Sequence, residues 1–509
     1  MVQLQLLGDS SGAESAWPSG PSRRVVRSIT GDPPYLPTLN PSAAVGERLL
    51  VVSDRLPWTV ASQGATPQLR AGAGGVATEM RAPHARMGAL WLGWPGRITE
   101  LDVGQRQAIL ALLEASSAVP VELDDEEQRI YHDHICNGVL WPLCHDRLDR
   151  LPLRLDGWEV YERVNQRFAD AVAARHRSGD IVWVHDFQLM RAPSLLRRAL
   201  PEARIGHFFH VPFPNPELFL TLPPRRHLLE GMLGADVIGF HTHRYRGHFV
   251  AALRRQLGLE MDEHEMVRWE GRRIRLLVAP MSVDARDVAT RAAAPPISAR
   301  RLAIRRDGSR LLVGIDRLDY SKGIPRRLLA FERLLEEHPQ WHERVRLVQV
   351  AVPSRGDVDA DPRFRKEVEA LVGRINGRFS TPTWSPVHYI NRSIADDLLL
   401  GLYRAADVML VTPVRDGLNL VCKEFIASRV DEDGVLILSE FAGAADELTD
   451  ALLVNPYDVD ATATRMHDAL VMSNAERRHR MRRLRRQVLE HDVHTWTDVF
   501  LRALTAARP

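Results

Sequence analysis

Two cations and a carboxylate follow predicted strands in the C-terminal half of the chain. Arg317 and Lys322 share a loop after the apolar run 311–315, and Asp416 follows the apolar run 407–411. Arginine and lysine together suit a diphosphate, because both donate charge-assisted hydrogen bonds to phosphate oxygens. An aspartate can accept hydroxyl groups of a sugar. The pattern therefore predicts a nucleotide-sugar site; the alternative is surface charge with ordinary helix capping.

Lysine is rare in this chain, which bears on the role of Lys322. Of the 67 basic residues only three are lysines, namely Lys322, Lys366 and Lys423. Lysine carries a compact point charge, so a position that keeps it in an arginine-rich chain can mark a need for that geometry. Two of the three lie in the candidate site, which favours a functional interpretation, although chance can produce the same placement.

A helix is predicted to begin at about Asn419, directly after the turn that contains Asp416. The first amides of a helix have no partner within it and carry a partial positive charge, so they can bind ligand oxygens. Glu424 follows about one turn later, where a carboxylate can bind a ribose diol. Turns of this kind, between a parallel strand and a helix, are where open α/β sheets bind ligands.

Polar side chains also end two predicted strands in the N-terminal half. The run 180–186 ends in His185 and Asp186, and the run 204–210 ends in His210, with a helix predicted between them. Strand, helix and strand at this spacing form a βαβ unit, which brings both carboxyl ends to one edge of a parallel sheet. Functional and structural roles for these side chains are about equally supported.

His132 and His134 are close enough in the chain to suggest a metal site. Their spacing and the lack of a matching carboxylate favour packed or solvated histidines instead. No Asp-x-Asp metal signature lies among the candidate site residues. We therefore expect neither a metal nor another cofactor.

The composition is ordinary for a soluble globular protein, with 45% hydrophobic and 26% charged residues. A net charge of +2 argues against nucleic-acid and membrane partners. The cysteines, Cys136, Cys144 and Cys422, form neither a disulfide framework nor a metal spacing. No uncharged apolar run reaches the ~18 residues of a membrane span, and the N-terminus lacks a secretory pattern, so a cytoplasmic protein is expected.

Predicted strands and helices alternate through both halves of the chain, which indicates an α/β fold with two doubly wound, Rossmann-like domains facing a central cleft. Residues 1–46 are rich in Ser, Pro, Gly and Ala and are expected to form a flexible extension. The first domain is expected at 47–290 and the second at 291–490, because the Ala-, Arg- and Pro-rich segment 284–307 separates them. A C-terminal helix in 491–509 is expected to pack back on the first domain.

Several long motifs, collinear from about Arg48 onwards, resemble the trehalose-6-phosphate synthase family. They are Ser53–Pro57, Gly74–Gly75, Trp91–Trp94, Asn137–Pro142, His185–Asp186, His210–Pro214, Gly314–Gly323, Arg374–Gly377 and Arg415–Asn419. The resemblance implies a retaining glycosyltransferase of the GT-B type, which moves glucose from UDP-glucose or GDP-glucose to glucose 6-phosphate and gives α,α-trehalose 6-phosphate. It implies no cofactor and is compatible with a homo-oligomer. No Asp-x-Asp-Gly phosphatase motif follows the matched region, so a fused phosphatase is not expected.

The same resemblance implies roles for individual residues. It places Arg317 and Lys322 on the donor diphosphate, Asp416 on the donor glucose and His210 beside the transferred sugar. With Asp186, these are the residues expected to be catalytic. The other donor-binding positions that it implies are Gly74, Gly75, Ile394, Asn419, Leu420, Val421 and Glu424. The acceptor-binding positions are Arg55, Trp94, Tyr131, Trp141 and Arg355.

Three departures from the family pattern lie on the acceptor side and leave the acceptor open. The family usually has Asn at position 54 and often Tyr at position 132, where this chain has Asp54 and His132, and its Tyr-His is Phe187–Gln188 here. A sister transferase that uses glycerol 3-phosphate, or a relative that makes a non-glycosidic bond, is therefore an alternative. A non-catalytic regulatory protein would show lesions among the donor residues, and none is present.

Overall fold

The N-terminal half builds an eight-stranded sheet that is parallel except for one edge strand. In the computed structural model its order is β5 (Ala118–Pro120), β4 (Leu90–Trp94), β1 (Leu49–Arg55), β6 (Ile181–His185), β7 (Arg204–Phe209), β8 (Val237–Phe240), β10 (Arg272–Val278) and β9 (Met266–Trp269). Only β9 runs antiparallel to its neighbour. A separate hairpin pairs β2 (Trp58–Gln63) with β3 (Thr66–Ala71).

Both faces of this sheet are covered, which explains why its strands are continuous apolar runs. In β6, Val182 and Val184 enter one hydrophobic cluster, while Ile181 and Trp183 enter the other. The helices of this half are α2 (Arg81–Met87), α3 (Val103–Ala115), α4 (Asp125–Glu127), the π-helix Gln128–Leu140, α5 (Trp141–Cys144), α6 (Trp158–Ala173), α7 (Ala192–Ala199), α8 (Pro216–Phe219), α9 (Arg225–Met232) and α10 (His243–Leu257).

The C-terminal half builds a six-stranded sheet in which all neighbours are parallel. Its order is β13 (Val387–Ile390), β12 (Val345–Val352), β11 (Arg310–Arg317), β14 (Val408–Val411), β15 (Val435–Ser439) and β16 (Leu452–Val454). Strand order reverses between β11 and β14. Their carboxyl ends therefore flank the switch point at which doubly wound sheets bind ligands.

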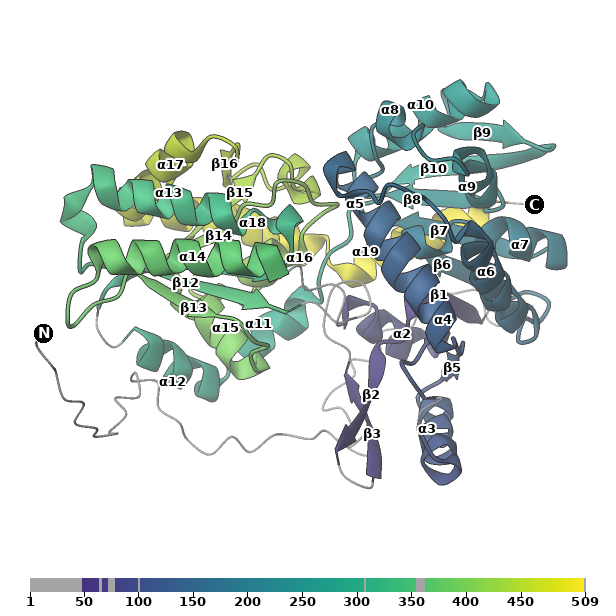
Figure 1. The fold of residues 1–509 in the computed structure, drawn as a ribbon, viewed down its shortest axis with the longest axis horizontal. Helices are drawn as coiled ribbons and strands as arrows, with labels where there is room; N and C mark the ends of the chain where they lie inside the picture. The colour runs from purple at the N-terminus through teal and green to yellow at the C-terminus, as the bar shows by residue number, and fades with distance from the viewer. Residues whose placement is uncertain are drawn as a thin grey trace, which may run out of the picture. The chain divides into compact units, whose positions relative to one another are not determined.

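Two groups of helices pack around the second sheet (Figure 1). One consists of α13 (Ile324–Glu337), α14 (Pro362–Phe379) and α17 (Val459–Val471). The other consists of α11 (Ala285–Ala293), α12 (Pro295–Ile304), α15 (Asp396–Ala405), α16 (Leu420–Ser428) and α18 (Asn474–Glu490). The boundary expected at residues 290 and 291 falls inside α11, and the domain limits stay a prediction.

The last helix, α19 (Val493–Ala506), lies against β7 and β8 of the first sheet. Phe500 stacks on Trp183 with ring centroids 4.5 Å apart. Gly206 makes room for this helix, because a Cβ atom there would lie 2.6 Å from the Phe500 ring. One hydrophobic cluster contains Trp183, Phe500 and Val411, so it joins α19 to strands of both sheets.

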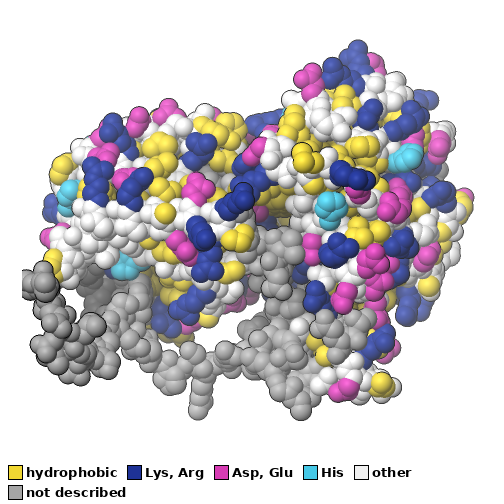
Figure 2. Space-filling model, viewed as in Figure 1, with side chains coloured by type: hydrophobic (Ala, Val, Ile, Leu, Met, Phe, Trp, Pro, Cys, Tyr) yellow, Lys and Arg dark blue, Asp and Glu magenta, His cyan; other side chains and the backbone are white. Residues whose placement is uncertain are grey.

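The structure describes residues 48–63, 66–71, 78–98, 101–305, 308–353 and 362–507, all within one compact unit. The extension expected at 1–46 lies outside them. The predicted α/β fold with two doubly wound sheets is confirmed. Among the described residues no helix is long and apolar enough to cross a membrane. Figure 2 shows acidic and basic side chains interspersed on the visible face, in keeping with the small net charge.

Candidate active site

Lys322 and Asp416 form a direct ion pair at the carboxyl ends of β11 and β14. The Nζ atom of Lys322, in the 3-10 turn Tyr320–Lys322, lies 2.6 Å from Oδ2 of Asp416. Burial alone would raise the pKa of the Asp416 carboxyl, but the charge and hydrogen bond of Lys322 outweigh it, and the pKa is lowered. Asp416 is therefore an ionised, fixed acceptor that can bind hydroxyl groups.

Asn419 connects this ion pair to the first turn of α16. Its backbone has a φ of 82°, and its Oδ1 accepts a hydrogen bond of 3.2 Å from the Cys422 amide. Its Nδ2 donates to Oδ2 of Asp416 at 3.1 Å. The amides of Leu420 and Val421 belong to the first turn, whose N–H groups have no acceptor within the helix. The site thus combines a carboxylate, an ammonium group and free helix amides.

Glu424 lies one turn further along α16. Its Oε2 accepts a hydrogen bond of 2.7 Å from the Tyr403 hydroxyl, and burial raises the pKa of its carboxyl. Ile394 lies in the loop before α15 and packs on the same hydrophobic cluster as Leu420 and Val421. The structure thus places Asn419, Leu420 and Val421 at the start of α16, with Glu424 one turn further along.

Arg317 is exposed at the end of β11 and faces the other half of the chain. Its guanidinium carbon lies 4.9 Å from the ring centroid of Trp141, at the start of α5. Trp141 stacks in turn on His145, with ring centroids 4.0 Å apart. A residue expected at the donor and a residue expected at the acceptor are therefore in contact.

Asp186 and His210 meet at the carboxyl ends of β6 and β7. Oδ1 of Asp186 accepts the His210 amide at 3.0 Å, and Nε2 of His210 lies 2.9 Å from Nδ1 of His185. Burial raises the pKa of the Asp186 carboxyl to about 7, even though backbone amides oppose the shift. Burial, and then the neighbouring histidines, lower the pKa of His210. At neutral pH His210 is therefore a neutral imidazole that can take part in hydrogen bonds.

The described acceptor-side residues lie at the ends of β1 and β4, in the π-helix and at the start of α5. The Arg55 guanidinium lies 4.8 Å from the ring centroid of Trp94, and the Tyr131 hydroxyl donates to the backbone oxygen of Gln188 at 3.3 Å. His132 contacts both Asp54 and Arg55. Within the described ranges no group of three or more His, Cys, Asp or Glu residues could hold a metal ion.

Three contacts between the halves were not foreseen from the sequence. The Tyr245 hydroxyl donates to the backbone oxygen of Asp416 at 2.9 Å. Nε of Arg415 lies 3.2 Å from Oδ2 of Asp146. Gly417 packs on the His210 backbone so tightly that a Cβ atom would collide with its carbonyl oxygen. Arg415 and Gly417 flank Asp416 in the motif Arg415–Asn419, which is a usable signal, whereas nothing in the sequence marks Tyr245.

Three predicted positions lie outside the described residues, namely Gly74, Gly75 and Arg355. Their roles stay predictions. The structure brings together Lys322 and Asp416, and it separately brings together Asp186 and His210.

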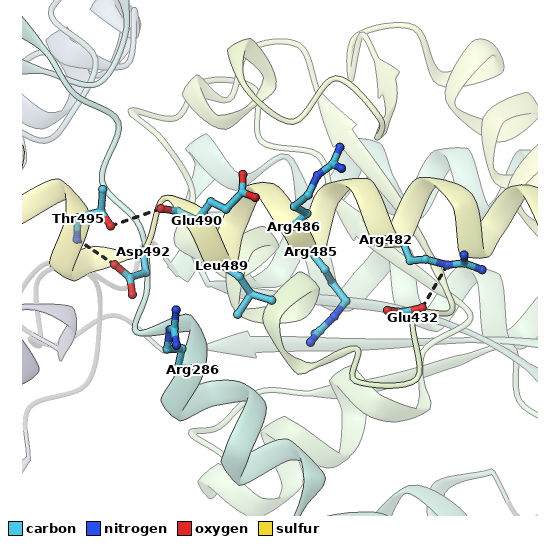
Figure 3. Close-up of a pocket in the computed structure, with 9 residues that line it drawn as sticks. All are labelled: Arg286, Glu432, Arg482, Arg485, Arg486, Leu489, Glu490, Asp492 and Thr495. Atoms are coloured by element: carbon cyan, nitrogen blue, oxygen red, sulfur yellow. Dashed lines mark hydrogen bonds and ion pairs between the residues drawn. The ribbon is translucent and has the colours of Figure 1, made fainter. Parts of the chain in front are cut away.

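A hollow of about 460 Å³ lies where α11, α18 and α19 meet and contains none of the predicted site residues (Figure 3). It is lined by Arg286, Glu432, Arg482, Arg485, Arg486, Leu489, Glu490, Asp492 and Thr495. Several of these charges already have structural partners. Arg482 pairs with Glu432 at 3.1 Å, and Asp492 accepts the Thr495 amide at 2.9 Å. The candidate site therefore stays at the switch point of the second sheet.

Comparison with known proteins places the chain among sugar transferases. The family model described as Glycosyltransferase family 20 matches residues 47–506. An alpha,alpha-trehalose-phosphate synthase [UDP-forming] of Schizosaccharomyces pombe is 37% identical over 484 residues, which is 94% of this chain and 92% of that protein. Some other relatives are longer, and the chain spans 50% to 64% of three of them.

Solved structures agree with this relationship. A structure described as trehalose-6-phosphate from E. coli bound with UDP-2-fluoro glucose is 35% identical, with a TM-score of 0.79 over 90% of this chain and 99% of that one. An alpha,alpha-trehalose-phosphate synthase (UDP-forming) from Burkholderia xenovorans in complex with glucose-6-phosphate is 34% identical, with a TM-score of 0.80 over 90% of this chain and 100% of that one. The fold is of the GT-B type, and the chain belongs to glycosyltransferase family 20.

Proposed function

We propose that this protein transfers glucose from a nucleotide-glucose to glucose 6-phosphate and gives α,α-trehalose 6-phosphate, with retention at the anomeric carbon. The observation that carries the proposal is the ionised Asp416, held by Lys322 at the first turn of α16. This arrangement offers an acceptor for sugar hydroxyls beside donors for a diphosphate. Relatives described as UDP-forming favour UDP-glucose over GDP-glucose as the donor.

The difficult step is the cleavage of the bond between the anomeric carbon and the diphosphate. Negative charge grows on the leaving oxygen, and Arg317 and Lys322 are proposed to stabilise it. Asp416 would hold the donor glucose through its hydroxyls, and Glu424 would bind the ribose. Retention without an enzymic nucleophile suggests attack on the same face. The acceptor oxygen then bonds to the anomeric carbon while its proton passes to the departing phosphate.

The acceptor phosphate is proposed to bind Arg55, Tyr131 and Arg355, with Trp94 and Trp141 beside the acceptor sugar. Of the two arginines, Arg55 lies within the described residues, and its contact with the Trp94 ring limits the orientations of its guanidinium. Asp186, whose pKa of about 7 leaves it partly protonated at neutral pH, and the neutral His210 are proposed to contact the sugars. The Burkholderia relative described in complex with glucose-6-phosphate supports this acceptor.

The test is turnover by the purified protein with UDP-glucose or GDP-glucose and each of three acceptors: glucose 6-phosphate, glucose and glycerol 3-phosphate. We expect α,α-trehalose 6-phosphate from glucose 6-phosphate, with its two anomeric centres assigned by NMR. A preference for glycerol 3-phosphate would show the sister transferase instead. Binding of the donor without turnover of any acceptor would show a regulatory protein.

A further inference from the structure

His132 lies between a carboxylate and a guanidinium on the acceptor side. Its Nε2 is 2.6 Å from Nη2 of Arg55, and its Nδ1 is 3.2 Å from Oδ2 of Asp54. Nε of Arg55 is farther from that carboxylate, at 4.0 Å. The imidazole therefore provides the shorter connection between the two charged groups.

The chemistry of these groups decides where the ring proton lies. A guanidinium has only donors, so Nε2 of His132 must be the acceptor of the Arg55 hydrogen bond. The proton of the neutral ring then sits on Nδ1, which faces the Asp54 carboxylate at contact distance without being aligned to it as a hydrogen bond. Burial raises the pKa of Asp54, but His132 and Arg55 outweigh burial and the pKa is lowered, so this carboxylate is ionised.

Exposure separates the roles of the three side chains. The side chains of Asp54 and His132 are 7% and 8% exposed, whereas that of Arg55 is 24% exposed. A ligand can therefore reach Arg55 but has little access to the two groups behind it. Asp54 and His132 therefore contact Arg55 on its buried side, opposite the side that a ligand can reach.

The end of β1 fixes this arrangement from the backbone side. Oγ of Ser53 donates to the Arg55 carbonyl at 2.7 Å and accepts from Nε1 of Trp91 at 2.8 Å. The register of β1 shifts between Val52 and Arg55, where Arg55 pairs with Trp94 of β4. This irregularity turns two successive side chains, Asp54 and Arg55, into the same cluster instead of to opposite faces.

We propose that Asp54 and His132 form a carboxylate–imidazole relay that orients Arg55 toward the phosphate of the acceptor. Both are positioning residues, because they act through Arg55 and do not touch the ligand. This inference takes the acceptor, a sugar phosphate, from the proposed function. The relay restricts Arg55 before the ligand binds, which lowers the ordering cost that a free arginine would add to binding.

His132→Phe and His132→Gln form the matched test, because phenylalanine keeps the ring but loses both nitrogens, while the glutamine amide can still accept and donate. For His132→Phe we expect KM for glucose 6-phosphate to rise about tenfold, as for loss of a hydrogen bond to a charged group. The donor KM should stay at the wild-type value and kcat within about threefold, and His132→Gln should recover most of the acceptor KM. Use of free glucose should not change, because it has no phosphate for Arg55.

Asp133→Asn and His134→Phe are the control variants. They change an aspartate and a histidine, as the test variants do, but at half-buried positions next to His132 in the π-helix. Both should keep the wild-type acceptor KM. Equal rises in the control and test variants would show a general disturbance of the helix and overturn the relay. If His132→Phe does not fold, Asp54→Asn replaces it, because the neutral amide is a weaker acceptor; an unchanged KM there also overturns the relay.

A second readout does not depend on the reaction. In crystal structures of the variants, we expect Arg55 to leave the Trp94 ring in His132→Phe and to keep its place in His132→Gln. An unmoved Arg55 in His132→Phe rejects the relay even if the enzyme makes trehalose 6-phosphate. If the wild type does not use glucose 6-phosphate, the proposed function fails, and the position of Arg55 alone decides the relay.

Discussion

A carboxylate holds a cation on each side of this site, but in two different ways. On the donor side Lys322 and Asp416 touch directly at 2.6 Å, and each side chain is 12% exposed. On the acceptor side Asp54 and Arg55 are 4.0 Å apart with His132 bridging them, and only the arginine is accessible. A direct pair suits a site where both charges are to meet the ligand. An indirect pair suits a site where only the cation is to do so.

The largest expected effect tests the donor side. Lys322→Ala and Arg317→Ala should each lower kcat by at least about 10²-fold, the scale for losing one group that stabilises charge in the transition state. Steady-state kinetics with UDP-glucose and glucose 6-phosphate measure the effect. Arg326→Ala is the control, because Arg326 lies nearby on α13 and packs over Tyr457. Near wild-type rates in both test variants would remove Arg317 and Lys322 from the mechanism.

The acceptor side should respond to the phosphate of its substrate. Free glucose should have a kcat/KM at least about tenfold below that of glucose 6-phosphate, because it forgoes the charge-assisted hydrogen bonds of Arg55. Arg55→Ala should narrow that ratio by reducing use of the phosphorylated sugar alone. Comparable kcat/KM values for the two acceptors in the wild type would refute the acceptor assignment and leave the donor assignment intact.

Much of the donor side could be predicted from the sequence, because its residues are close in the chain and follow strong patterns. An apolar strand, a turn with Asp416 and a capping Asn419 belong to one local segment, and strand, turn and helix signals are local. The pairing of Lys322 with Asp416 follows once β11 and β14 are neighbours at the switch point. The structure adds the distance and the ionised state.

The acceptor side was harder to predict, because its contacts join distant segments. Asp54 read in isolation is an extra negative charge near a phosphate site, and His132 is a packed or solvated histidine. Only the packing of the π-helix against the end of β1 shows that the two side chains face each other. Tyr245 gave no signal at all, since a helical tyrosine looks like any core residue until its partner is known.

The buried histidines of the first half should make the protein less stable in acid. Burial lowers the pKa of His185 to about 3, of His207 to about 4 and of His241 to about 3, all in the first half. Below about pH 6.5 the unfolded chain binds protons that these folded histidines do not, so acidification favours unfolding. Burial raises the pKa of Asp186 to about 7 and that of Glu79 to about 8. These two carboxyl groups act in the opposite direction, because the folded state binds their protons at a higher pH than the unfolded chain does.

His84, His145 and His210 also have lowered pKa values, and Asp146 and Glu424 also have raised ones, so these histidines still outnumber these carboxyl groups. The free energy of unfolding should therefore fall between about pH 6.5 and about pH 4. Each histidine contributes a slope of up to about 1.4 kcal/mol per pH unit. Denaturant unfolding across this range measures it. His207→Gln should have a shallower slope than the wild type; a slope that is unchanged, or a chain that is more stable in acid, contradicts the assignment.

The smallest expected effect tests the connection between the two sides. Tyr245→Phe removes only the hydroxyl that donates to the Asp416 carbonyl at 2.9 Å, and it keeps the ring under Arg415. The carbonyl also accepts the Gly443 amide at 3.2 Å, so it keeps one partner, and the loss of stability should be about 1 kcal/mol. Because Asp416 is held on its other side by Lys322, a small movement of its backbone should lower kcat about threefold and raise the donor KM, while the acceptor KM stays unchanged. A change confined to the acceptor KM would show that Tyr245 supports the acceptor side instead. The assignment of Asp416 and its contacts to the donor side would then be wrong.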